Sequence, residues 1–343
     1  VTVDRWGLGD RAVTYGKYTA HYIAQPRIRG PLRRILNIRR LREKIRHLRP
    51  AIVHAQIAGQ YSEAAHGAGV PYVLTLHGVR YLEAQLKTGI IDRLYRRHLI
   101  AHEERKSIRD APSIISINPF IDECFPNELK GRVERIENPT ADSWFDIGEE
   151  GNPRGMLYAG RITPRKDILT LLKAFREVHQ KYPDATLRIA GAPDNPDPIG
   201  YFDDMKAFVA RNGLQDSVTF LGNLSEPDLH AEYAQNAIFV LAAVLETAPM
   251  SIAQAQAAGR LVVTTDAGGC RHMIRNGESG FVVPIGDHEA FSRALLECLD
   301  EPARTHGMRE KARADAESRY RAATIADRTI RLYKQILGVE QRG

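Results

Sequence analysis

Residues 156–181 of this 343-residue chain read MLYAGRITPRKDILTLLKAFREVHQK. The apolar run that begins at Met156 ends in Ala159 and Gly160, which is typical of a strand that leads into a turn. After Lys166, apolar residues recur at steps of three and four, which is typical of an amphipathic helix. The stretch therefore predicts a strand, a turn and a helix in succession, the repeating unit of α/β proteins.

The same alternation of short apolar runs and long amphipathic segments continues along almost the whole chain. Nearly all-apolar strands are expected where helices cover both faces of a parallel sheet. We therefore predict an α/β protein with two Rossmann-like domains. The expected strands are 51–56, 72–76, 113–117 and 133–137 in the first half, and 156–158, 186–190, 217–221, 237–241, 261–264 and 281–283 in the second.

The boundary between the domains is expected in the stretch 138–153, where prolines, glycines and acids interrupt any periodic pattern. We place a first Rossmann-like domain at 1–145 and a second at 146–320. The last segment, 321–343, is expected to be a helix that returns toward the first domain.

The beginning of the chain departs from this scheme. A Rossmann-like domain normally opens with a strand that runs into a glycine-rich turn, yet this chain begins with VTVDRWGLGDRAVTYG. The run 1–4 is a weak leading strand, with Gly7 and Gly9 as candidates for the turn. We therefore expect that the first strand and its loop are missing, through a truncation or a misassigned start.

Composition indicates a soluble, cytoplasmic protein. Of all residues, 43% are hydrophobic and 26% are charged, which suits two α/β domains and excludes disordered and fibrous classes. No apolar run approaches the roughly 20 residues that cross a bilayer. The three cysteines, Cys124, Cys270 and Cys298, lie far apart and lack the spacing of a metal site or a disulfide framework, which suits a reducing cytosol.

The formal net charge of +6 comes almost entirely from residues before about 150. Its densest part, 27–49, holds nine arginines and Lys44 against the single acid Glu43, and its apolar residues recur at helical spacing. Such a helix either packs on a core with a solvated basic face or attracts anionic lipid headgroups, by about 1 kcal/mol per basic residue. Nucleic acid is not expected, because no aromatic residues are interleaved with the arginines.

Two basic residues surround the turn in GRITPRK. Arg161 follows the strand and Lys166 precedes the helix, whose start carries a positive dipole and backbone N–H donors. A planar guanidinium, a compact ammonium and these donors would together bind a doubly charged group, for which a diphosphate is the natural candidate. An isolated pair of this kind is more often an ordinary surface feature.

A carboxylate marks a second strand end, in LETAPMSIAQAQAAGRLVVTTDAGG at 245–269. Glu246 is expected to end an apolar strand, and Pro249 to open an alanine-rich helix that Thr247 could cap. A carboxylate at the carboxyl end of a strand faces the edge where open α/β sheets bind ligands. Glu246 is therefore a site candidate, and the alternative is a capping or ion-paired acid.

Together these segments resemble glycosyltransferase family four, a large family of retaining enzymes with the GT-B fold, over nearly the whole chain. The resemblance rests on GRITPRK, on Glu246 and Gln254 with seven residues between them, on Gly268 and Gly269, and on the strings ESGFVV, VLTLHG and RIENP. Each motif is weak alone, but their order and spacing are specific. The resemblance implies two domains with parallel sheets facing across a cleft, an acceptor-side N-terminal domain and a C-terminal domain that binds the nucleotide sugar.

The resemblance also assigns roles to residues. It implies that Arg161, Lys166 and Gly160 bind the diphosphate of the donor. Glu246 would lie beside the transferred sugar, and His77 would face that sugar from the first domain, although taken alone His77 is more often a hydrogen-bonded loop histidine. Further positions expected around the donor are Gln254, Thr247, Ala248, Met250 and Ser251 for the ribose and sugar, and Gly191 and Leu224 for the base.

Two departures from the family pattern bear on activity. Gln254 stands where the family usually has a second glutamate, although an amide oxygen still accepts from a ribose hydroxyl. Pro249 lies in the turn where relatives commonly offer backbone N–H groups to the sugar, and proline cannot donate. These changes leave open the alternative that the chain is an inactive relative of the family and acts as a binding subunit.

The function that we predict is retaining transfer of a sugar from a nucleoside diphosphate sugar, of the UDP or GDP type, to a glycan or lipid-linked acceptor in cell-surface polysaccharide or glycoconjugate synthesis. No cofactor and no metal are expected, because two cations would neutralise the leaving group and no acidic metal motif stands out. The basic first half favours an anionic acceptor and a peripheral position on the inner face of the cytoplasmic membrane. A sugar-nucleotide epimerase is the alternative enzyme, whereas a dinucleotide oxidoreductase lacks its GxGxxG fingerprint.

Overall fold

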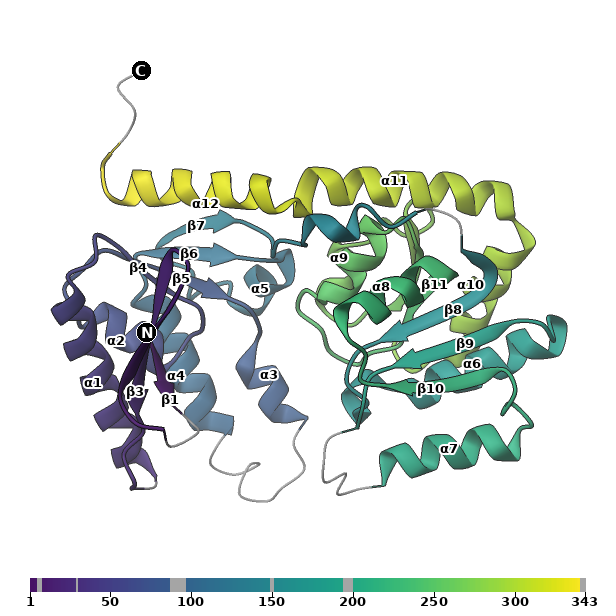
Figure 1. Cartoon of the computed structure of the whole chain (residues 1–343), viewed down its shortest axis with the longest axis horizontal. Coiled ribbons are helices and arrows are strands. Elements are labelled where there is room, and N and C mark those ends of the chain that lie inside the picture. The colour runs from purple at the N-terminus through teal and green to yellow at the C-terminus, as the bar shows by residue number, and fades with distance from the viewer. Residues whose placement is uncertain (5–7, 29, 87–96, 149–150, 194–199, 340–343) are drawn as a thin grey trace. The chain divides into compact units, whose positions relative to one another are not determined.

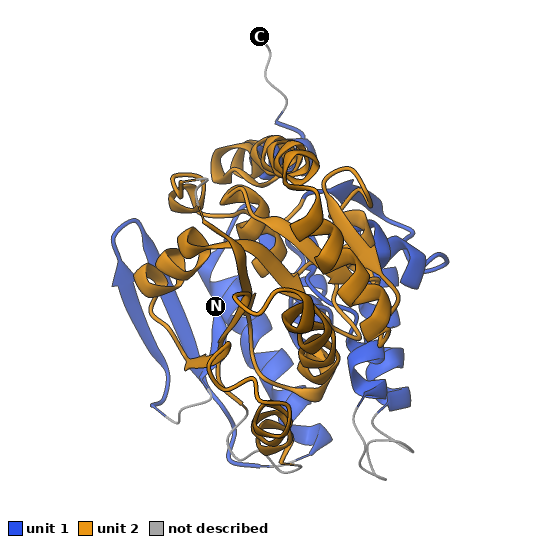
Figure 2. Ribbon diagram, turned by 90° about the vertical axis from the view of Figure 1, so that its right-hand side faces the viewer, with its two compact units in different colours: residues 1–136, 328–343 blue, residues 137–327 orange. Residues whose placement is uncertain are grey.

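The computed structural model of the chain describes residues 1–4, 8–28, 30–86, 97–148, 151–193 and 200–339. The chain folds into two compact units, which Figure 2 shows in separate colours. Unit 1 comprises Val1–Ile136 together with the stretch from Arg328 onward, and unit 2 comprises Glu137–Asp327. Both are α/β, as the sequence predicts, and their main sheets consist of parallel strands.

Unit 2 starts ahead of the boundary expected at 145. The reason is that Trp144 and Ile147 are buried in its hydrophobic core, so the preceding residues pack with this unit as well. Helix α12 (Ala322–Ile336) belongs to both units, since unit 2 ends at Asp327. The chain therefore passes between the units twice.

Unit 2 is built on a six-stranded sheet in which every neighbouring pair is parallel. The strands are β8 (Asn152–Ala159), β9 (Thr186–Ala190), β10 (Val218–Gly222), β11 (Asn236–Leu241), β12 (Leu261–Thr265) and β13 (Gly280–Val283). Their order is β10-β9-β8-β11-β12-β13, and Figure 1 shows β8, β9 and β10 side by side. The strand order thus reverses between β8 and β11, which is where open parallel sheets bind ligands, outside the carboxyl ends of the strands.

Helices connect these strands and pack on the sheet. They are α6 (Ile168–Lys181), α7 (Tyr201–Arg211), α8 (Glu226–Gln235), α9 (Met250–Ala257), α10 (His288–Asp300) and α11 (Pro302–Tyr320), with the short 3-10 turns η3 (Pro164–Lys166) and η4 (Gly269–His272). The helix predicted after Lys166 is confirmed as α6. It buries the whole predicted apolar face, namely Ile168, Leu171, Leu172, Phe175 and Val178.

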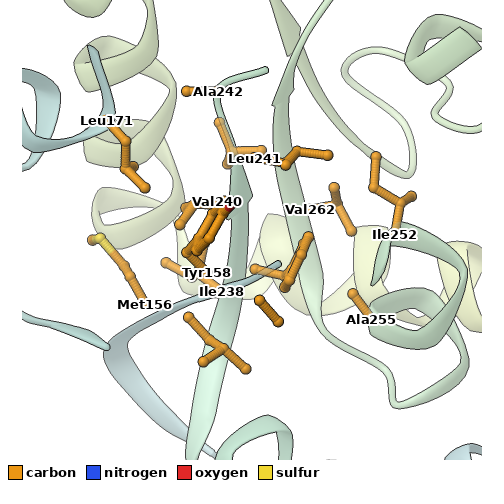
Figure 3. Close-up of a cluster of buried hydrophobic side chains, with 14 of the residues drawn as sticks. Met156, Tyr158, Leu171, Ile238, Val240, Leu241, Ala242, Ile252, Ala255 and Val262 are labelled. Carbon is orange, nitrogen blue, oxygen red and sulfur yellow. The ribbon is translucent and has the colours of Figure 1, made fainter. Parts of the chain in front are cut away.

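The core of unit 2 lies between its central strands and the helices packed on them. Strands β11 and β12 are buried along their whole length, as is typical of strands covered on both faces. Figure 3 shows the side chains that meet in this cluster, among them Met156 and Tyr158 of β8, Ile238 and Val240 of β11, Val262 of β12, and Ile252 and Ala255 of α9. The ends of β8 and β11 are therefore anchored in one continuous core.

Unit 1 contains a four-stranded parallel sheet in the order β4-β5-β6-β7. Its strands are β4 (Val53–Ala55), β5 (Tyr72–Leu76), β6 (Ser113–Ser116) and β7 (Arg132–Arg135), and its helices are α1 (Pro31–Leu48), α2 (Gln60–His66), α3 (Arg80–Gln85), α4 (Arg97–Arg109) and α5 (Pro119–Cys124). All four strands fall at the positions that the sequence predicts.

A separate three-stranded sheet lies near the beginning of the chain. Strands β2 (Arg11–Tyr15) and β3 (Tyr18–Ala24) form an antiparallel hairpin, and β1 (Thr2–Asp4) pairs in parallel with β3. This hairpin was not expected. The suggestion that residues 1–4 and Gly9 form the leading strand and turn of the Rossmann-like sheet is wrong, because β1 pairs with β3 outside the main sheet. Gly7 lies outside the described residues.

The basic stretch 27–49 forms helix α1, as predicted, but its apolar stripe is only partly buried. Leu41 and Ile45 lie in a hydrophobic cluster of unit 1, whereas Leu32 and Ile35 are 56% and 57% exposed. Apolar side chains therefore lie beside basic ones on the surface of α1. Among the described residues, no helix combines the length and apolarity of a membrane span.

Several arginines of α1 have partners within unit 1. Acids bind three of them: Arg34 pairs with Glu63 and Glu103, Arg39 with Glu43, and Arg40 with Asp10. Arg46 donates to the backbone carbonyl oxygens of Gly67 and Ala68, just after α2. Much of the positive charge on α1 therefore helps to hold this helix in place, and the net charge overstates its free basic surface.

Candidate active site

Three of the expected site residues lie in the loop that follows β8. This loop runs from Gly160 to Lys166 and ends in the turn η3, and α6 then begins at Ile168. Asp167, between the two, has a φ of 43°, which is uncommon for a residue other than glycine and turns the chain sharply before the helix. The loop thus presents Arg165 and Lys166 beyond the carboxyl end of β8, at the reversal of strand order.

Backbone hydrogen bonds and a glycine hold this loop against its neighbour. The N–H of Gly160 donates to the carbonyl oxygen of Ala190 over 3.0 Å, and that of Gly191 donates to Gly222 over 2.7 Å. Gly191 has a φ of +137°, and a Cβ there would lie 1.8 Å from the carbonyl oxygen of Gly160, so no other residue fits without a shift. Gly191, expected near the base, therefore packs directly on the loop expected to bind the diphosphate. Leu224, also expected near the base, is partly buried against the core after β10.

Glu246 lies in the loop that follows β11. The strand ends at Leu241, where the expected range 237–241 also ends, so the expectation that Glu246 itself ends a strand is wrong. Its backbone is fixed on both sides, because its N–H donates to the carbonyl oxygen of Ala267 over 3.2 Å and its own carbonyl accepts from Gly269 over 2.8 Å. The glycine pair 268–269, after β12, therefore supports the position of this carboxylate.

The carboxylate of Glu246 lies between two cations. Its Oε1 is 2.6 Å from Nζ of Lys166 and 3.2 Å from Nη1 of Arg165. The same Nη1 donates to the carbonyl oxygen of Leu245 over 2.8 Å, and the carbonyl oxygen of Arg165 accepts from the N–H of Val244 over 2.9 Å. These bonds join the loop after β8 to the loop after β11. We call Arg165, Lys166 and Glu246 the switch-point cluster.

The switch-point cluster carries an excess of positive charge, since two cations face one carboxylate. The side chains of Lys166 and Glu246 are only 12% and 9% exposed, so water screens their charges less than it screens a surface pair. Burial raises the pKa of the nearby Tyr158 hydroxyl well above its usual value, and the charges of Arg165 and Arg161 oppose that shift. An anion that entered this site would therefore meet a net positive potential.

The arginine that contacts Glu246 is Arg165, which sequence reasoning missed. Arg161, the arginine that was singled out, is exposed, and its backbone carbonyl accepts a 2.7 Å hydrogen bond from the Tyr158 hydroxyl. The cause is local, because η3 places Arg165 beside Lys166 and against the loop that carries Glu246. No spacing in the sequence indicates which of the three cations of GRITPRK contacts Glu246.

Two backbone N–H groups at the start of α6 have acceptors within unit 2. The N–H of Leu169 donates to the hydroxyl of Tyr201 over 3.2 Å, and the N–H of Thr170 donates to the carbonyl oxygen of Asp167 over 3.1 Å. Burial raises the pKa of Tyr201 to about 12, so this hydroxyl stays neutral and remains a hydrogen-bond partner. These two N–H groups therefore already have acceptors, and diphosphate binding at the start of α6 stays a prediction. Positive charge at this loop comes from the side chains of Arg165 and Lys166.

Helix α9 begins four residues after Glu246, at Met250. The expected cap by Thr247 is wrong, because Pro249 occupies the N-cap position and its side chain has no hydrogen-bonding atom. The positive end of α9 therefore lies close in sequence to the switch-point cluster. Of the remaining positions expected around the donor, Thr247 is buried and Ala248, Met250, Ser251 and Gln254 are partly exposed.

In unit 1, His77 directly follows β5 and is exposed. Its Nε2 lies 2.7 Å from Oε1 of Gln56, which directly follows β4. Because β4 and β5 are parallel neighbours, both side chains come from the carboxyl edge of the unit 1 sheet. This edge is the one at which a Rossmann-like unit would bind a ligand.

A second histidine of unit 1, His54, was not singled out from the sequence. Its Nδ1 lies 2.5 Å from the hydroxyl of Tyr333 in α12, and its Nε2 lies 2.5 Å from the hydroxyl of Thr75 in β5. Burial, with a smaller contribution from the charge of His77, lowers the pKa of His54 to about 4. His54 is therefore neutral at physiological pH and ties α12 to the sheet.

Cys270 of unit 2 does not offer a reactive thiol. Burial raises the pKa of Cys270, which lies close in sequence to the glycine pair, to about 12, so its thiol stays protonated and unreactive. Across the ranges that the structure describes, no group of three or more His, Cys, Asp or Glu side chains could hold a metal ion.

Comparison with protein families gives two adjacent matches. The model of glycosyl transferases group 1 matches residues 141–315, and the model of Glycosyltransferase Family 4 matches residues 5–140. The first match covers more than half of the chain and contains the whole switch-point cluster.

Individual proteins agree with these matches. The chain is similar to alpha-D-kanosaminyltransferase from Streptomyces kanamyceticus, with 24% identity over 324 residues that cover 88% of this chain and 82% of that protein. Its structure is similar to sucrose-phosphate synthase from Thermosynechococcus elongatus, with a TM-score of 0.79 and 18% identity over 96% of this chain and 86% of the other. It is also similar to Anabaena Alr3699/HepE in complex with UDP and glucose, with a TM-score of 0.71 and 19% identity over 91% and 84% of the two chains. These structural likenesses confirm the predicted GT-B fold with two Rossmann-like units.

Proposed function

This chain belongs to the family glycosyl transferases group 1, and from that premise we propose that it moves a sugar from a nucleoside diphosphate sugar to a hydroxyl group of an acceptor. It is a glycosyltransferase of the hexosyltransferase type. The observation that carries the proposal is the switch-point cluster, in which Arg165 and Lys166 face Glu246 where the strand order of unit 2 reverses.

The cations of the cluster suit the departure of a diphosphate. When the bond between the anomeric carbon and the diphosphate breaks, negative charge grows on the phosphate and positive charge grows on the sugar ring. Lys166 and Arg165, with Arg161 on the exposed side of the same loop, would stabilise the phosphate. One preorganised contact of this kind typically stabilises a transition state by ~3 kcal/mol, or roughly a hundredfold in rate.

Glu246 would act in two ways. Without a donor it neutralises Lys166 and Arg165 and holds their side chains in place. A bound diphosphate would compete for the same ammonium and guanidinium groups, which leaves the carboxylate to face the sugar. There its charge would stabilise the positive ring of the transition state, with little screening by water. We assign a sugar-binding role to His77 of unit 1, which lies at the ligand-binding edge of its own sheet.

Retention of configuration and independence of metal belong to the same proposal. Family membership supports retention. The two cations that face Glu246 support metal independence, since they could neutralise a diphosphate in place of Mg²⁺. EDTA should therefore leave the rate of transfer unchanged. Loss of activity in EDTA would contradict metal independence.

The donor is proposed to be a UDP or GDP sugar, and the likeness to a structure that holds UDP and glucose favours UDP. The loops that carry Gly191 and Leu224 would meet the base. Residues near the start of α9 would meet the ribose and the sugar, namely Gln254, Thr247, Ala248, Met250 and Ser251. Beyond this donor, no cofactor is proposed.

The acceptor is proposed to be a glycan or a lipid-linked glycan in cell-surface polysaccharide or glycoconjugate synthesis. Unit 1 carries the excess positive charge, and α1 exposes Leu32 and Ile35 among its basic residues. Both features would let unit 1 rest on the anionic inner face of the cytoplasmic membrane. Sedimentation with vesicles that contain or lack phosphatidylglycerol tests this, and equal binding to both kinds of vesicle would remove the membrane from the proposal.

Calorimetric titration with UDP and with GDP tests the donor site. The protein should bind one of the two, and Lys166→Ala should weaken that binding at least about tenfold, because an ammonium contact to phosphate is lost. Lys173→Ala is the matched control, since Lys173 is an exposed lysine on α6. Unchanged affinity in Lys166→Ala would refute the assignment.

One alternative function is favoured by particular residues. Gln254 and Pro249 weaken the pattern expected around the ribose and the sugar, which would suit an inactive binding subunit. Such a subunit would bind a nucleotide without turning over a donor sugar. Incubation with the donor alone also distinguishes a transferase from a sugar-nucleotide epimerase, because an epimerase would change the sugar in the absence of an acceptor.

A further inference from the structure

We propose that unit 1 carries a binding site for a phosphate group that stands beside hydroxyl groups, as on a phosphorylated sugar or a lipid headgroup. The site is a cavity of about 500 Å³ lined by the side chains of Arg33, Arg34 and Arg80, together with Asn37, Gln60 and Tyr61. Only the identification of this ligand as the acceptor rests on the proposed function. The phosphate site itself follows from unit 1 alone.

The cavity lies at the carboxyl edge of the unit 1 sheet. Ile57 and Ala58 in its wall follow β4, and Arg80 follows β5, the parallel neighbour of β4. His77 and Gln56, which contact each other, follow the same two strands. A ligand in the cavity would therefore lie at the edge that carries His77, where parallel sheets bind their ligands.

The three arginines differ in the acids that lie near them. Arg34 pairs with Glu63 and, over 3.1 Å, with Glu103, so its charge is already balanced. The charge of Arg80 is attracted by the buried carboxylate of Glu104. Arg33 lines the cavity, and no acid among the described residues forms an ion pair with it. Arg33 is therefore the arginine of the wall whose charge is left for an anionic ligand.

Arg80 is held in position before any ligand arrives. Its backbone N–H donates to the buried carboxylate of Glu104 over 2.8 Å, and its Nη1 donates to the carbonyl oxygen of Ala58 over 2.9 Å. Gly59 has a φ of +123°, and a Cβ there would lie 2.8 Å from the same Nη1, so a glycine is needed for this approach. A guanidinium has five N–H donors in a rigid fork, which leaves donors for a phosphate.

Arg33 lies in the first turn of α1, which contains no acidic residue. A cation at the positive end of a helix is unfavourable, whereas an anion there is favourable, so a bound phosphate would offset the placement of Arg33.

Asn37 provides an independent sign of a ligand. It lines the cavity on the same helix, it is only 3% exposed, and its Oδ1 lacks a hydrogen-bond partner in the part of the chain that the structure describes. A buried acceptor without a donor is unfavourable, and a ligand hydroxyl is a donor of the kind it lacks. Arginines and a carboxamide oxygen in one cavity thus match a phosphate flanked by hydroxyl groups.

The test uses the whole chain, a soluble probe and a lipid probe. Calorimetry compares glucose 6-phosphate with glucose, and sedimentation compares vesicles of phosphatidylglycerol with vesicles of phosphatidylcholine. A soluble acceptor predicts that glucose 6-phosphate binds at least about tenfold more tightly than glucose. A lipid headgroup predicts that phosphatidylglycerol vesicles bind and phosphatidylcholine vesicles do not.

Arg33→Gln should weaken whichever phosphate probe binds at least about tenfold. Arg39→Gln is the matched control, since Arg39 lies on the same helix, pairs with Glu43 and is not in the cavity wall. It should stay within about twofold of the wild type. If circular dichroism shows that Arg33→Gln loses its fold, Arg33→Lys replaces it, with a smaller loss expected because the charge remains and the fork is gone.

Several results would overturn the inference. They are binding of neither phosphate probe, equal binding by Arg33→Gln and wild type, and displacement of glucose 6-phosphate by UDP, which would place the probe in the donor site. A UDP titration of the same samples keeps the two proposals apart. If the protein binds UDP but no phosphate probe, only the inference fails. If it binds glucose 6-phosphate in an Arg33-dependent way but neither UDP nor GDP, only the proposed donor site fails.

Discussion

The switch-point cluster of unit 2 and the arginines of α1 in unit 1 use positive charge in opposite ways. The stretch 27–49 holds nine arginines, far more than the GRITPRK loop. Yet the pair Arg39–Glu43 has side chains that are 74% and 58% exposed, whereas Lys166 and Glu246 are nearly buried. Exposed pairs contribute about 0–1 kcal/mol, while desolvated charges at fixed positions can act strongly on a ligand. Burial at a strand end therefore marks a site better than the number of charges does.

The largest effect should come from the carboxylate of the cluster. In Glu246→Gln the turnover should fall roughly a hundredfold, or about 3 kcal/mol, because the positive transition state loses its counter-charge. The affinity for UDP should not fall, since Lys166 and Arg165 lose a competitor for phosphate. Rate assays and calorimetry on the same samples measure both. Full turnover in Glu246→Gln would contradict the stronger role of the buried charges. The control is Glu278→Gln, since Glu278 is an exposed acid of unit 2.

A backbone change should have the next largest effect. In Gly191→Ala the new Cβ meets the carbonyl oxygen of Gly160, so unfolding of unit 2 should require about 2 kcal/mol less free energy, with weaker UDP binding. Urea unfolding followed by fluorescence measures the change. Gly213→Ala serves for comparison, because Gly213 also has a positive φ but faces open space. If both variants lose the same stability, the contact between the loops does not support the site.

Acid should act on unit 1 through His54. The folded protein keeps His54 neutral down to about pH 4, whereas the unfolded chain takes up its proton near pH 6.5. Between these values the unfolded state binds more protons, so stability falls as the pH falls, by about 1 kcal/mol after allowance for partial exposure. Urea unfolding at pH 7 and pH 5 measures the loss. His54→Gln should flatten the dependence, and His98→Gln, at an exposed position on α4, should not.

The smallest effect should come from the exposed pair on α1. Arg39→Gln should change the free energy of unfolding by less than about 0.5 kcal/mol, because water and salt screen Arg39 and Glu43. Thermal unfolding in low and high salt measures it. A loss of several kcal/mol would show that exposed charges on α1 matter as much as the buried ones of unit 2.

Most of the fold could be predicted because the parallel strands are buried on both faces and therefore read as apolar runs. The hairpin of β2 and β3 escaped prediction because its strands are largely exposed and carry polar side chains. Its two-residue connection, Gly16 and Lys17, is a hairpin signal that could have been used.

The candidate site was predictable only where it depends on strand ends. Lys166 and Glu246 follow β8 and β11, so topology alone brings them together. Arg165 reaches Glu246 through a 3-10 turn and a backbone hydrogen bond to Val244, and neither is encoded in local spacing. The hydroxyl of Tyr201, which occupies the N–H of Leu169, likewise comes from a distant helix.

The division of the chain between the two units sets an order for their synthesis. Unit 2 is one continuous stretch, Glu137–Asp327, whereas unit 1 also needs residues of α12, where Tyr333 meets His54. A ribosome that makes this chain from its amino end therefore releases all of unit 2 before it has supplied the last part of unit 1. The unit that starts second can finish folding first, and the earlier one remains incomplete in the nascent chain until α12 emerges.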